Sequence, residues 1–281
     1  PLPLLVIAEM IGIRPEDREA FHEWSDAMIL AAGQQDRPEI ITRATDAYLA
    51  YTQYLQEIFA ERRREPRDDL VSILLQAEAD GALTTDEENI SADELLQFMT
   101  ILLVAGNETT RNAISGGMVA FGENPDQWQR LREDPSLLPS AVEEILRWVT
   151  PVVGFRRTVL EDTAIRGRRI RAGERVVMLY QSANRDEDVF PEADLFRVDR
   201  KPNEHLAFGI GTHFCLGANL ARAEIRVMYR ELLRRLPDIH VAPGARPLMV
   251  ASPLVRGIAS LPTLFTPEER TTRGSVEAAV S

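Results

Sequence analysis

The chain has 281 residues, of which 44% are hydrophobic and 27% charged, so it has enough apolar material for a substantial buried core. Its 32 basic and 44 acidic residues leave a formal net charge of −12, which argues against a general nucleic-acid binder because such proteins carry basic patches. A single cysteine excludes an internal disulfide framework, and with only four histidines it also excludes a cysteine-rich zinc site. No apolar run approaches the ~18 residues that a membrane span needs, so we expect a globular, cytoplasmic protein.

The chain begins Pro1-Leu2-Pro3, without methionine, and its first residues already have the pattern of an amphipathic helix. We therefore expect that an N-terminal portion is missing, and the lack of a targeting or anchoring segment carries little weight.

The first two thirds of the chain predict one helix after another. Apolar residues recur at helical spacing over residues 5–11, after Asp17 and over residues 47–59. After an arginine-rich loop, Asp68 or Asp69 is expected to cap a helix over residues 70–79, which Gly81 ends.

The next helix has a complete start signal. Ser91 and Glu94 have the S-x-x-E spacing in which each side chain can satisfy the free backbone N–H of the other residue. The helical pattern then continues to about Phe121, which predicts a helix of roughly 45 Å. Gly106 in its middle costs about 1 kcal/mol of helix stability, so we expect that something approaches the backbone there.

The last part of the chain changes in character. A short helix is expected after Pro139, up to Val149, and β-branched segments between Phe155 and Tyr180, separated by glycine turns, predict a small antiparallel sheet. Further along we expect a long irregular segment over 184–203, a helix over about 216–236, short strands over 250–264 and a disordered tail over 266–281. We see no repeat or boundary, so residues 1–265 form one predicted domain.

The densest chemical signal is the segment 208–217, Phe-Gly-Ile-Gly-Thr-His-Phe-Cys-Leu-Gly. It holds Cys215 in a glycine-punctuated loop that leads directly into a helix. Backbone N–H donors and a positive helix end favour a thiolate, so Cys215 is expected to be an iron ligand or a nucleophile. The alternative is a buried structural cysteine, which would not need the backbone freedom of the flanking glycines.

This loop resembles the F-x-x-G-x-[RH]-x-C-x-G signature of the cytochrome P450 haem-thiolate monooxygenases. Two further segments stand in the order and at the distance typical of that family. Ala105-Gly106-Asn107-Glu108-Thr109-Thr110 is similar to the motif of the long central helix, and Glu144-Ile145-Leu146-Arg147 is similar to the E-x-x-R motif. The resemblance, to soluble bacterial members, implies a mainly α fold with small antiparallel β-sheets, lacking its N-terminal portion.

The resemblance implies that haem b is bound through Cys215 as the axial thiolate, which favours O–O cleavage. His213 and Arg157 would hold the haem propionates, although Arg157 has the alternative of being an ordinary charge on a strand face. The implied set of cofactor-binding residues is Ala105, Gly106, Arg157, Phe208, Gly209, Gly211, His213, Cys215 and Gly217.

The resemblance assigns the oxygen chemistry to Glu108 and Thr109, because an alcohol with a carboxylate behind it can relay protons to bound oxygen. Ala105 and Gly106 lack bulk, so dioxygen and substrate can lie against the helix. The alternative is a polar kink in which Thr109 bonds back to a carbonyl four residues earlier.

Glu144 and Arg147 stand one helical turn apart and could form a simple surface pair worth a few tenths of a kcal/mol. The resemblance implies instead a buried network that fixes the cysteine loop. Many relatives place an arginine where this chain has Leu195; either Arg197 or Arg200 can substitute, and the sequence does not choose between them.

The substrate site is expected to have an apolar wall, which favours an apolar substrate. Its expected members follow the E-x-x-R helix or lie in the last hairpin: Pro151, Val152, Val153, Phe155, Pro253, Leu254 and Val255. The resemblance extends to bacterial members that act on steroids and lipids, and it implies insertion of one atom of dioxygen into such a substrate.

The chain contains no flavin or nicotinamide motif, so electrons from NAD(P)H are expected to arrive through a separate reductase and ferredoxin. The helix after the cysteine carries a basic stripe at four-residue spacing, which would attract an acidic ferredoxin by electrostatic steering. It consists of Arg222, Arg226, Arg230 and Arg234.

Two other functions stay open. A haem-thiolate enzyme could use peroxide directly, although the pair Glu108-Thr109 counts against this. The chain could also be a non-catalytic fragment, because loss of its front would leave one haem edge uncovered, so that haem is poorly retained and thermal stability is low.

Overall fold

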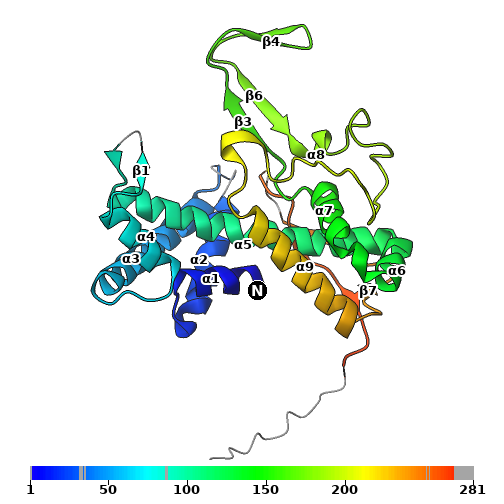
Figure 1. Ribbon diagram of the computed structural model, residues 1–281, viewed down its shortest axis with the longest axis horizontal. Helices are drawn as coiled ribbons and strands as arrows, with labels where there is room; N and C mark the ends of the chain where they lie inside the picture. The colour runs from blue at the N-terminus through cyan, green and yellow to red at the C-terminus, as the bar shows by residue number, and fades with distance from the viewer. Residues whose placement is uncertain are drawn as a thin grey trace, which may run out of the picture.

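Helices dominate the structure (Figure 1), a computed structural model that describes residues 2–31, 34, 36–85, 88–250, 252 and 254–268. The α-helices of the described chain are α1 (Leu2–Ile11), α2 (Arg18–Ala31), α3 (Pro38–Arg64), α4 (Leu70–Ala79), α5 (Ala92–Glu123), α6 (Pro125–Glu133), α7 (Leu138–Val149), α8 (Tyr180–Ala183) and α9 (Ala218–Arg235). Short 3₁₀ turns lie at Pro15–Asp17, Pro135–Leu137 and Gly211–His213.

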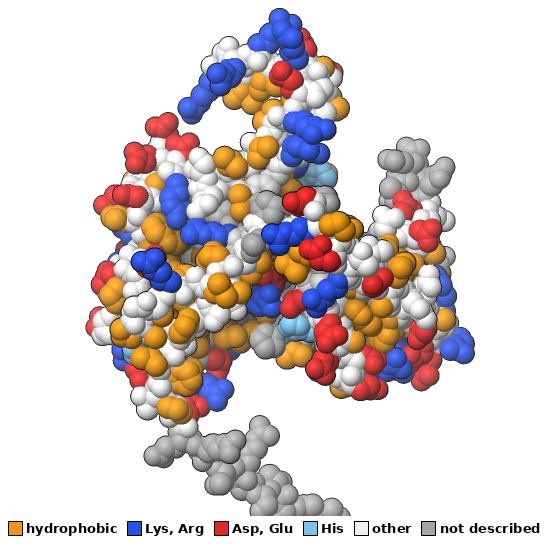
Figure 2. Space-filling view, turned by 180° about the vertical axis from the view of Figure 1, so that it is seen from behind, with side chains coloured by type: hydrophobic (Ala, Val, Ile, Leu, Met, Phe, Trp, Pro, Cys, Tyr) orange, Lys and Arg blue, Asp and Glu red, His pale blue; other side chains and the backbone are white. Residues whose placement is uncertain are grey.

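The strands form two-stranded antiparallel pairs. These are β1 (Thr84–Thr85) with β2 (Glu88–Asn89), β3 (Gly154–Thr158) with β6 (Arg175–Leu179), β4 (Thr163–Ile165) with β5 (Arg168–Ile170), β7 (His240–Val241) with β10 (Thr263–Leu264), and β8 (Leu248–Met249) with β9 (Ile258–Ser260). The predicted mainly α fold with small antiparallel sheets is confirmed. The β4–β5 hairpin stands clear of the body, and Figure 2 shows basic side chains gathered at its tip.

Helix α5 crosses the molecule and contacts α1, α2, α3, α7 and α9 (Figure 1). Its predicted capping box is confirmed: the Glu94 N–H donates to Ser91 Oγ at 3.2 Å, and the Ser91 N–H donates to Glu94 Oε2 at 2.8 Å. The two reciprocal bonds satisfy backbone donors at the helix start, which is why the helix begins where the sequence predicts.

Two buried clusters share α5. The first joins its N-terminal half to α1, α2, α3 and α4, and Tyr51 in its centre donates a hydrogen bond to the Met99 carbonyl at 3.1 Å. The second joins its C-terminal half to α6, α7 and α9, where Tyr229 donates to the Ile114 carbonyl at 2.8 Å. A Cβ atom at Gly117 would lie 2.2 Å from Tyr229 Oη, so the close approach of α9 requires glycine at that position.

The sequence predicts that another group lies close to the backbone at Gly106, and in the structure this group is a side chain of α1. A Cβ atom there would lie 2.9 Å from Ile7 Cδ1, so the small residue allows α1 to pack directly on α5. Gly106 therefore has a packing role on this side of the helix, and its contact with a cofactor stays a prediction.

Other predicted elements agree with the structure. Asp69, not Asp68, caps α4 by accepting the Ser72 N–H at 2.8 Å. Residues 184–203, all described, contain neither helix nor strand, as predicted. Residues 266–268 are irregular, whereas the rest of the predicted tail, 269–281, lies outside the described residues. None of the described helices is long and apolar enough to span a membrane.

Candidate functional site

Cys215 lies at the surface, in the loop that precedes α9. The Cys215 N–H donates to the Phe208 carbonyl at 3.0 Å, which closes the loop into a compact turn. Gly209 and Gly211 have φ angles of +72° and +74°, a conformation that side-chain-bearing residues rarely adopt. Gly209 and Gly211 therefore allow the left-handed turns of the loop that carries the thiol.

The thiol itself is held in its neutral form when no metal is bound. Partial burial raises the pKa of Cys215, and the Gly217 N–H and the charge of Arg222 lower it only in part. The backbone N–H donor favours the thiolate, as the sequence predicts, but desolvation of the thiol outweighs it and the charge of Arg222 as long as no metal is bound. A bound metal ion would supply the missing positive charge and displace the proton.

Apolar side chains of the cysteine loop and of the strands β3 and β6 are exposed to solvent. The loop exposes Ile210 (79%), Phe214 (51%) and Leu216 (76%), and the neighbouring strands expose Phe155, Val177 and Leu179. The two groups meet where Gly209 approaches Tyr180, because a Cβ atom at Gly209 would lie 3.5 Å from Tyr180 Oη. An exposed apolar surface beside a cysteine loop fits a large flat apolar group such as haem.

The two predicted propionate partners are Arg157 on β3 and His213 in the 3₁₀ turn of the cysteine loop. Arg157 and His213 are both exposed, and the described part of the chain shows no ion pair for either. Arg157 Nη1 donates to the Arg156 carbonyl at 3.2 Å, so its guanidinium keeps free donors. Both side chains are available to bind carboxylates, and their role as propionate partners stays a prediction.

Glu144 and Arg147 form a fully buried ion pair on α7. Arg147 donates to Glu144 Oε2 at 2.7 Å and to Oε1 at 2.8 Å, in the bidentate geometry that makes such pairs strong. The same guanidinium donates to three carbonyl oxygens, of Asn184, Ala193 and Leu195. The pair is buried and ties α7 to the irregular segment 184–203, while its predicted role of fixing the cysteine loop stays a prediction.

Arg200 completes this network. Its Nε lies 3.2 and 3.1 Å from the two Glu144 oxygens, and its side chain is buried. Arg197 instead offers its backbone N–H to Glu144, at 2.8 Å, while its exposed side chain pairs with Glu192 and Asp199. The structure therefore decides between the two arginines that the sequence left open.

A second polar chain connects α7 to the cysteine loop. Glu143 pairs with His205 at 3.1 Å and with Arg222 at 2.8 Å. Burial alone would raise the pKa of the Glu143 carboxyl, but these hydrogen bonds hold it at about 2. Arg222 also stacks 4.6 Å above the ring of Phe208, the residue that accepts the Cys215 N–H. Glu143 and Arg222 thus connect the cysteine loop to α7.

The sequence predicts that four arginines of α9 are available to bind an acidic partner, and the ion pairs in the structure change that prediction. Arg222 is committed to Glu143, and Arg234 pairs with Glu231 at 2.7 Å. Arg226 and Arg230 are exposed, and Arg230 lies 3.9 Å from Glu231. Arg222 is therefore unavailable to a partner, whereas Arg226 has no ion pair among the described residues, and Arg230 and Arg234 share Glu231.

Thr109 and Glu108 lie in the middle of α5 but on different sides of it. Thr109 Oγ1 donates to the Ala105 carbonyl at 2.7 Å, which is the helix-internal bond weighed as an alternative. Glu108 is 2% exposed; it accepts a hydrogen bond from Asn112 at 3.1 Å and forms an ion pair with Arg111. The described residues show no hydrogen bond between Glu108 and Thr109, so a relay through both stays a prediction.

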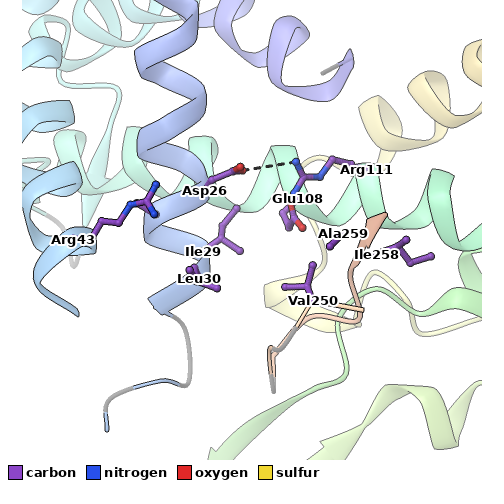
Figure 3. Close-up of a pocket in the computed structure, with 10 residues that line it drawn as sticks. Asp26, Ile29, Leu30, Arg43, Glu108, Arg111, Val250, Ile258 and Ala259 are labelled. Atoms are coloured by element: carbon purple, nitrogen blue, oxygen red, sulfur yellow. Dashed lines mark ion pairs between the residues drawn. The ribbon is translucent and has the colours of Figure 1, made fainter. Parts of the chain in front are cut away.

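Glu108 lines a cavity of about 430 Å³ between α2, α3, α5 and the β8–β9 pair (Figure 3). Asp26 and Arg111 also face it, and their ion pair, at 3.7 Å, is the dashed line in that view. Sequence reasoning missed Arg111, Asn112 and Asp26. Helical spacing from Glu108 could have found the first two, whereas nothing local connects Asp26 to them.

The two predicted substrate-wall segments lie side by side. Val152 and Val255 form an antiparallel bridge, and the Val153 N–H donates to the Leu254 carbonyl at 3.0 Å. Phe155 is exposed, whereas Pro253 lies outside the described residues. Their contact with substrate stays a prediction.

Comparison with known proteins identifies the family of this chain. The sequence model of the Cytochrome P450 family matches residues 35–263. A steroid C26-monooxygenase of Mycobacterium tuberculosis is 45% identical over 269 residues, which are 95% of this chain and 70% of that protein. A methyl-branched lipid omega-hydroxylase of Mycobacterium bovis is 42% identical over 95% of this chain and 60% of its own length.

Solved structures agree. CYP109E1 of Bacillus megaterium, in complex with testosterone, superimposes with a TM-score of 0.83 at 38% identity, covering 93% of this chain and 69% of that one. The substrate-free form of the same protein gives a TM-score of 0.86 at 36% identity, covering 95% and 69%. The chain thus spans about 60 to 70% of the length of these relatives.

Proposed function

Because this chain belongs to the cytochrome P450 family, whose cofactor is haem b, we propose that it is a haem-thiolate monooxygenase that oxidises apolar steroid-like or lipid-like molecules. The carrying observation is Cys215, the one cysteine, in a tight glycine loop that itself exposes apolar side chains to solvent. Such an arrangement fits haem, whose iron the exposed sulfur would bind. A cytoplasmic location is part of the same proposal.

Haem, when bound, supplies the activation of dioxygen and the transfer of one oxygen atom to substrate. Cys215 Sγ would bind its iron, while Arg157 and His213 would offset the charge of its carboxylates. The contacts of Phe208 with Arg222 and with the Cys215 N–H hold the sulfur in one position. Thr109 and Glu108 would move protons from the cavity side of α5 to the side of the cofactor.

The apolar character of the substrate is supported by the paired segments at Val152 and Val255 and by the names of the relatives. One of these relatives is named for the oxidation of a steroid and the other for the hydroxylation of a methyl-branched lipid. A binding screen of sterols and branched fatty acids, read from the spin-state shift of the haem iron, tests this proposal. Binding of small polar molecules in preference to both lipid classes would contradict it.

Thr109→Ala should divert reducing equivalents from product to hydrogen peroxide. The substitution removes the hydroxyl but leaves the helix, since the bond from Thr109 to the Ala105 carbonyl is not needed for helical geometry. We expect haem and substrate binding to be unchanged and the fraction of NAD(P)H that ends in product to fall by about tenfold or more. The measurement compares NAD(P)H consumed with product and peroxide formed.

Thr100→Ala is the matched control, because Thr100 makes the same type of bond, to the Leu96 carbonyl at 2.9 Å, elsewhere on α5. Product formation that stays coupled in Thr109→Ala would remove Thr109 from the relay. An enzyme that works equally well with added peroxide and without a reductase would favour the peroxide-using alternative instead.

An acidic ferredoxin is the proposed electron donor, and it would dock on the middle of α9. Arg226→Glu together with Arg230→Glu should slow electron transfer, because both side chains are exposed and the helix begins at the cysteine loop. The effect should shrink as salt is added. Stopped-flow reduction at several ionic strengths measures both.

Arg63→Glu is the control for charge reversal at a distance, since Arg63 lies at the C-terminal end of α3. Reduction rates that respond equally to both changes, or to neither, would place the docking site elsewhere.

The whole proposal is tested by the spectrum of the reduced protein with carbon monoxide. A red-shifted Soret band supports thiolate ligation, and formation of oxygenated product with a ferredoxin and reductase supports the reaction. A protein that binds no haem would support the fragment alternative.

A further inference from the structure

The β4–β5 hairpin concentrates positive charge in an acidic chain. Residues 154–179, which run from β3 through this hairpin to the end of β6, contain seven arginines and three acidic residues, whereas the whole chain has a net charge of −12. The hairpin stands clear of the body (Figure 1), and Figure 2 shows its basic side chains at the tip. The positive charge is therefore separated in space from the acidic body of the protein.

Most of these arginines have no partner within the protein. All of residues 154–179 are described, and the one ion pair among the seven arginines joins Arg169 to Asp162 at 2.6 Å. The side chains of Arg166, Arg168 and Arg171 are exposed and form no ion pair with the described residues. Unpaired like charges in one place repel one another, and a bound anionic surface would remove that repulsion.

The same hairpin exposes aliphatic side chains. Leu160, in the loop before β4, is 88% exposed, and Ile165 on β4 is 57% exposed. Ile165 is the cross-strand partner of Arg168, so the two side chains lie on the same face of the hairpin. Exposed aliphatic groups beside cationic groups are typical of surfaces that bind at the boundary between lipid headgroups and acyl chains.

We propose that the β4–β5 hairpin is a docking surface for an anionic phospholipid bilayer. Arg166, Arg168 and Arg171 would bind lipid phosphates, while Leu160 and Ile165 would insert between the headgroups. A specific protein partner needs about 800 Å² of matched surface on each side, which two strands of three residues, standing clear of the body, do not offer. A bilayer needs no matching shape, so a narrow charged tip is sufficient.

Docking of this kind goes beyond the proposed function and would serve it. The Val159 N–H donates to the Glu174 carbonyl at 2.9 Å, so the β3–β6 pair continues into the hairpin. Phe155, a predicted member of the apolar substrate wall, lies on β3. Steroid-like and lipid-like molecules partition into bilayers because of their apolar surface, so a docked hairpin would hold this wall near the phase in which they dissolve.

Co-sedimentation of the full protein with lipid vesicles tests the proposal without turnover. We expect binding to vesicles of phosphatidylcholine mixed with phosphatidylglycerol, little binding to phosphatidylcholine alone, and weaker binding as salt is added. A cationic side chain near an anionic surface contributes about fivefold in affinity, so Arg166→Gln, Arg168→Gln and Arg171→Gln together should weaken binding by about 100-fold. None of the three belongs to the predicted haem or substrate site, so the thiolate spectrum should not change.

The matched control removes the same charge from the body of the protein. Arg64→Gln, Arg132→Gln and Arg246→Gln together replace three exposed arginines that lie outside the hairpin, and this variant should bind the mixed vesicles like the wild type. Equal losses in the tip and control variants would show that only net charge matters and would overturn the proposal.

The aliphatic contribution has its own test. Leu160→Ser together with Ile165→Ser should weaken binding to the mixed vesicles by about tenfold. Ile73→Ser together with Val189→Ser is the control, because these side chains are 60% and 57% exposed but lie elsewhere. Unchanged binding in the Leu160 and Ile165 variant would overturn their insertion between the headgroups.

Three other outcomes would overturn the bilayer proposal. The first is that the wild-type protein does not bind the mixed vesicles. The second is that inorganic phosphate displaces it at the concentration of the lipid phosphate, which would indicate a site for a free anion. The third is salt-sensitive self-association that the tip substitutions abolish, which would indicate a second copy of this chain as the partner. Because none of these measurements uses turnover or the carbon monoxide spectrum, failure of this inference is distinguishable from failure of the proposed function.

Discussion

Cys215→Ala should abolish the red-shifted carbon monoxide band and all oxygenation, the largest functional effect expected for this chain. No other thiol is present that could replace the iron ligand. The substitution leaves the loop intact, because the Cys215 bond to Phe208 is made by its backbone N–H, and the left-handed turns are made by glycines. Absorbance spectra and product analysis measure the loss, and thermal unfolding checks that the fold persists.

Thr212→Ala is the matched control in the same exposed loop, and it should keep the band. A band that survives in Cys215→Ala would remove Cys215 as the ligand and with it the proposed chemistry.

Because burial raises the pKa of the Cys215 thiol in the absence of metal, we also expect the haem-free protein to react slowly with alkylating reagents at neutral pH.

Arg147→Met should cause the largest loss of stability. Arg147 is fully buried and donates five hydrogen bonds, two to Glu144 and three to backbone carbonyls. Removing one partner of a buried ion pair costs about 3–5 kcal/mol, because the remaining charge is left without compensation. Chemical denaturation measures the change in the free energy of unfolding.

Arg63→Met supplies the comparison, since Arg63 pairs with Glu78 at 2.9 Å but on the surface. Such a pair contributes about 0–1 kcal/mol, so its loss should be small. Equal effects of the two substitutions would show that the Glu144–Arg147–Arg200 network is not essential for stability. If Arg147→Met folds but binds haem weakly, the network acts on the cysteine loop more than on the fold.

Several elements could be predicted from the sequence because their signals are local. The Ser91–Glu94 capping box, the Asp69 cap and the glycine loop before Cys215 each depend on residues within a few positions of one another. Hydrogen bonds of this range form in the same way in many folds, so residue type and spacing are sufficient. The mainly α fold with small antiparallel sheets follows from the same kind of pattern.

The candidate site was predictable only in part. Cys215, Glu144 and Arg147 were identified by motif, but the partners that give them their properties lie far away in the chain. Arg200 reaches Glu144 across 56 positions, and Arg222 reaches Glu143 across 79. Which arginine completes a network depends on the path of an irregular segment, and no periodicity describes such a path.

What the sequence by itself determined is therefore the set of elements and the motif residues. The tertiary structure alone decided that Arg200 completes the buried network, that Arg222 anchors the loop, and that burial keeps the Cys215 thiol neutral without metal. It also brought Asp26 of α2 to the cavity of Glu108. The physical reason is that pKa values and ion pairs depend on desolvation and distance, which exist only once distant segments have packed together.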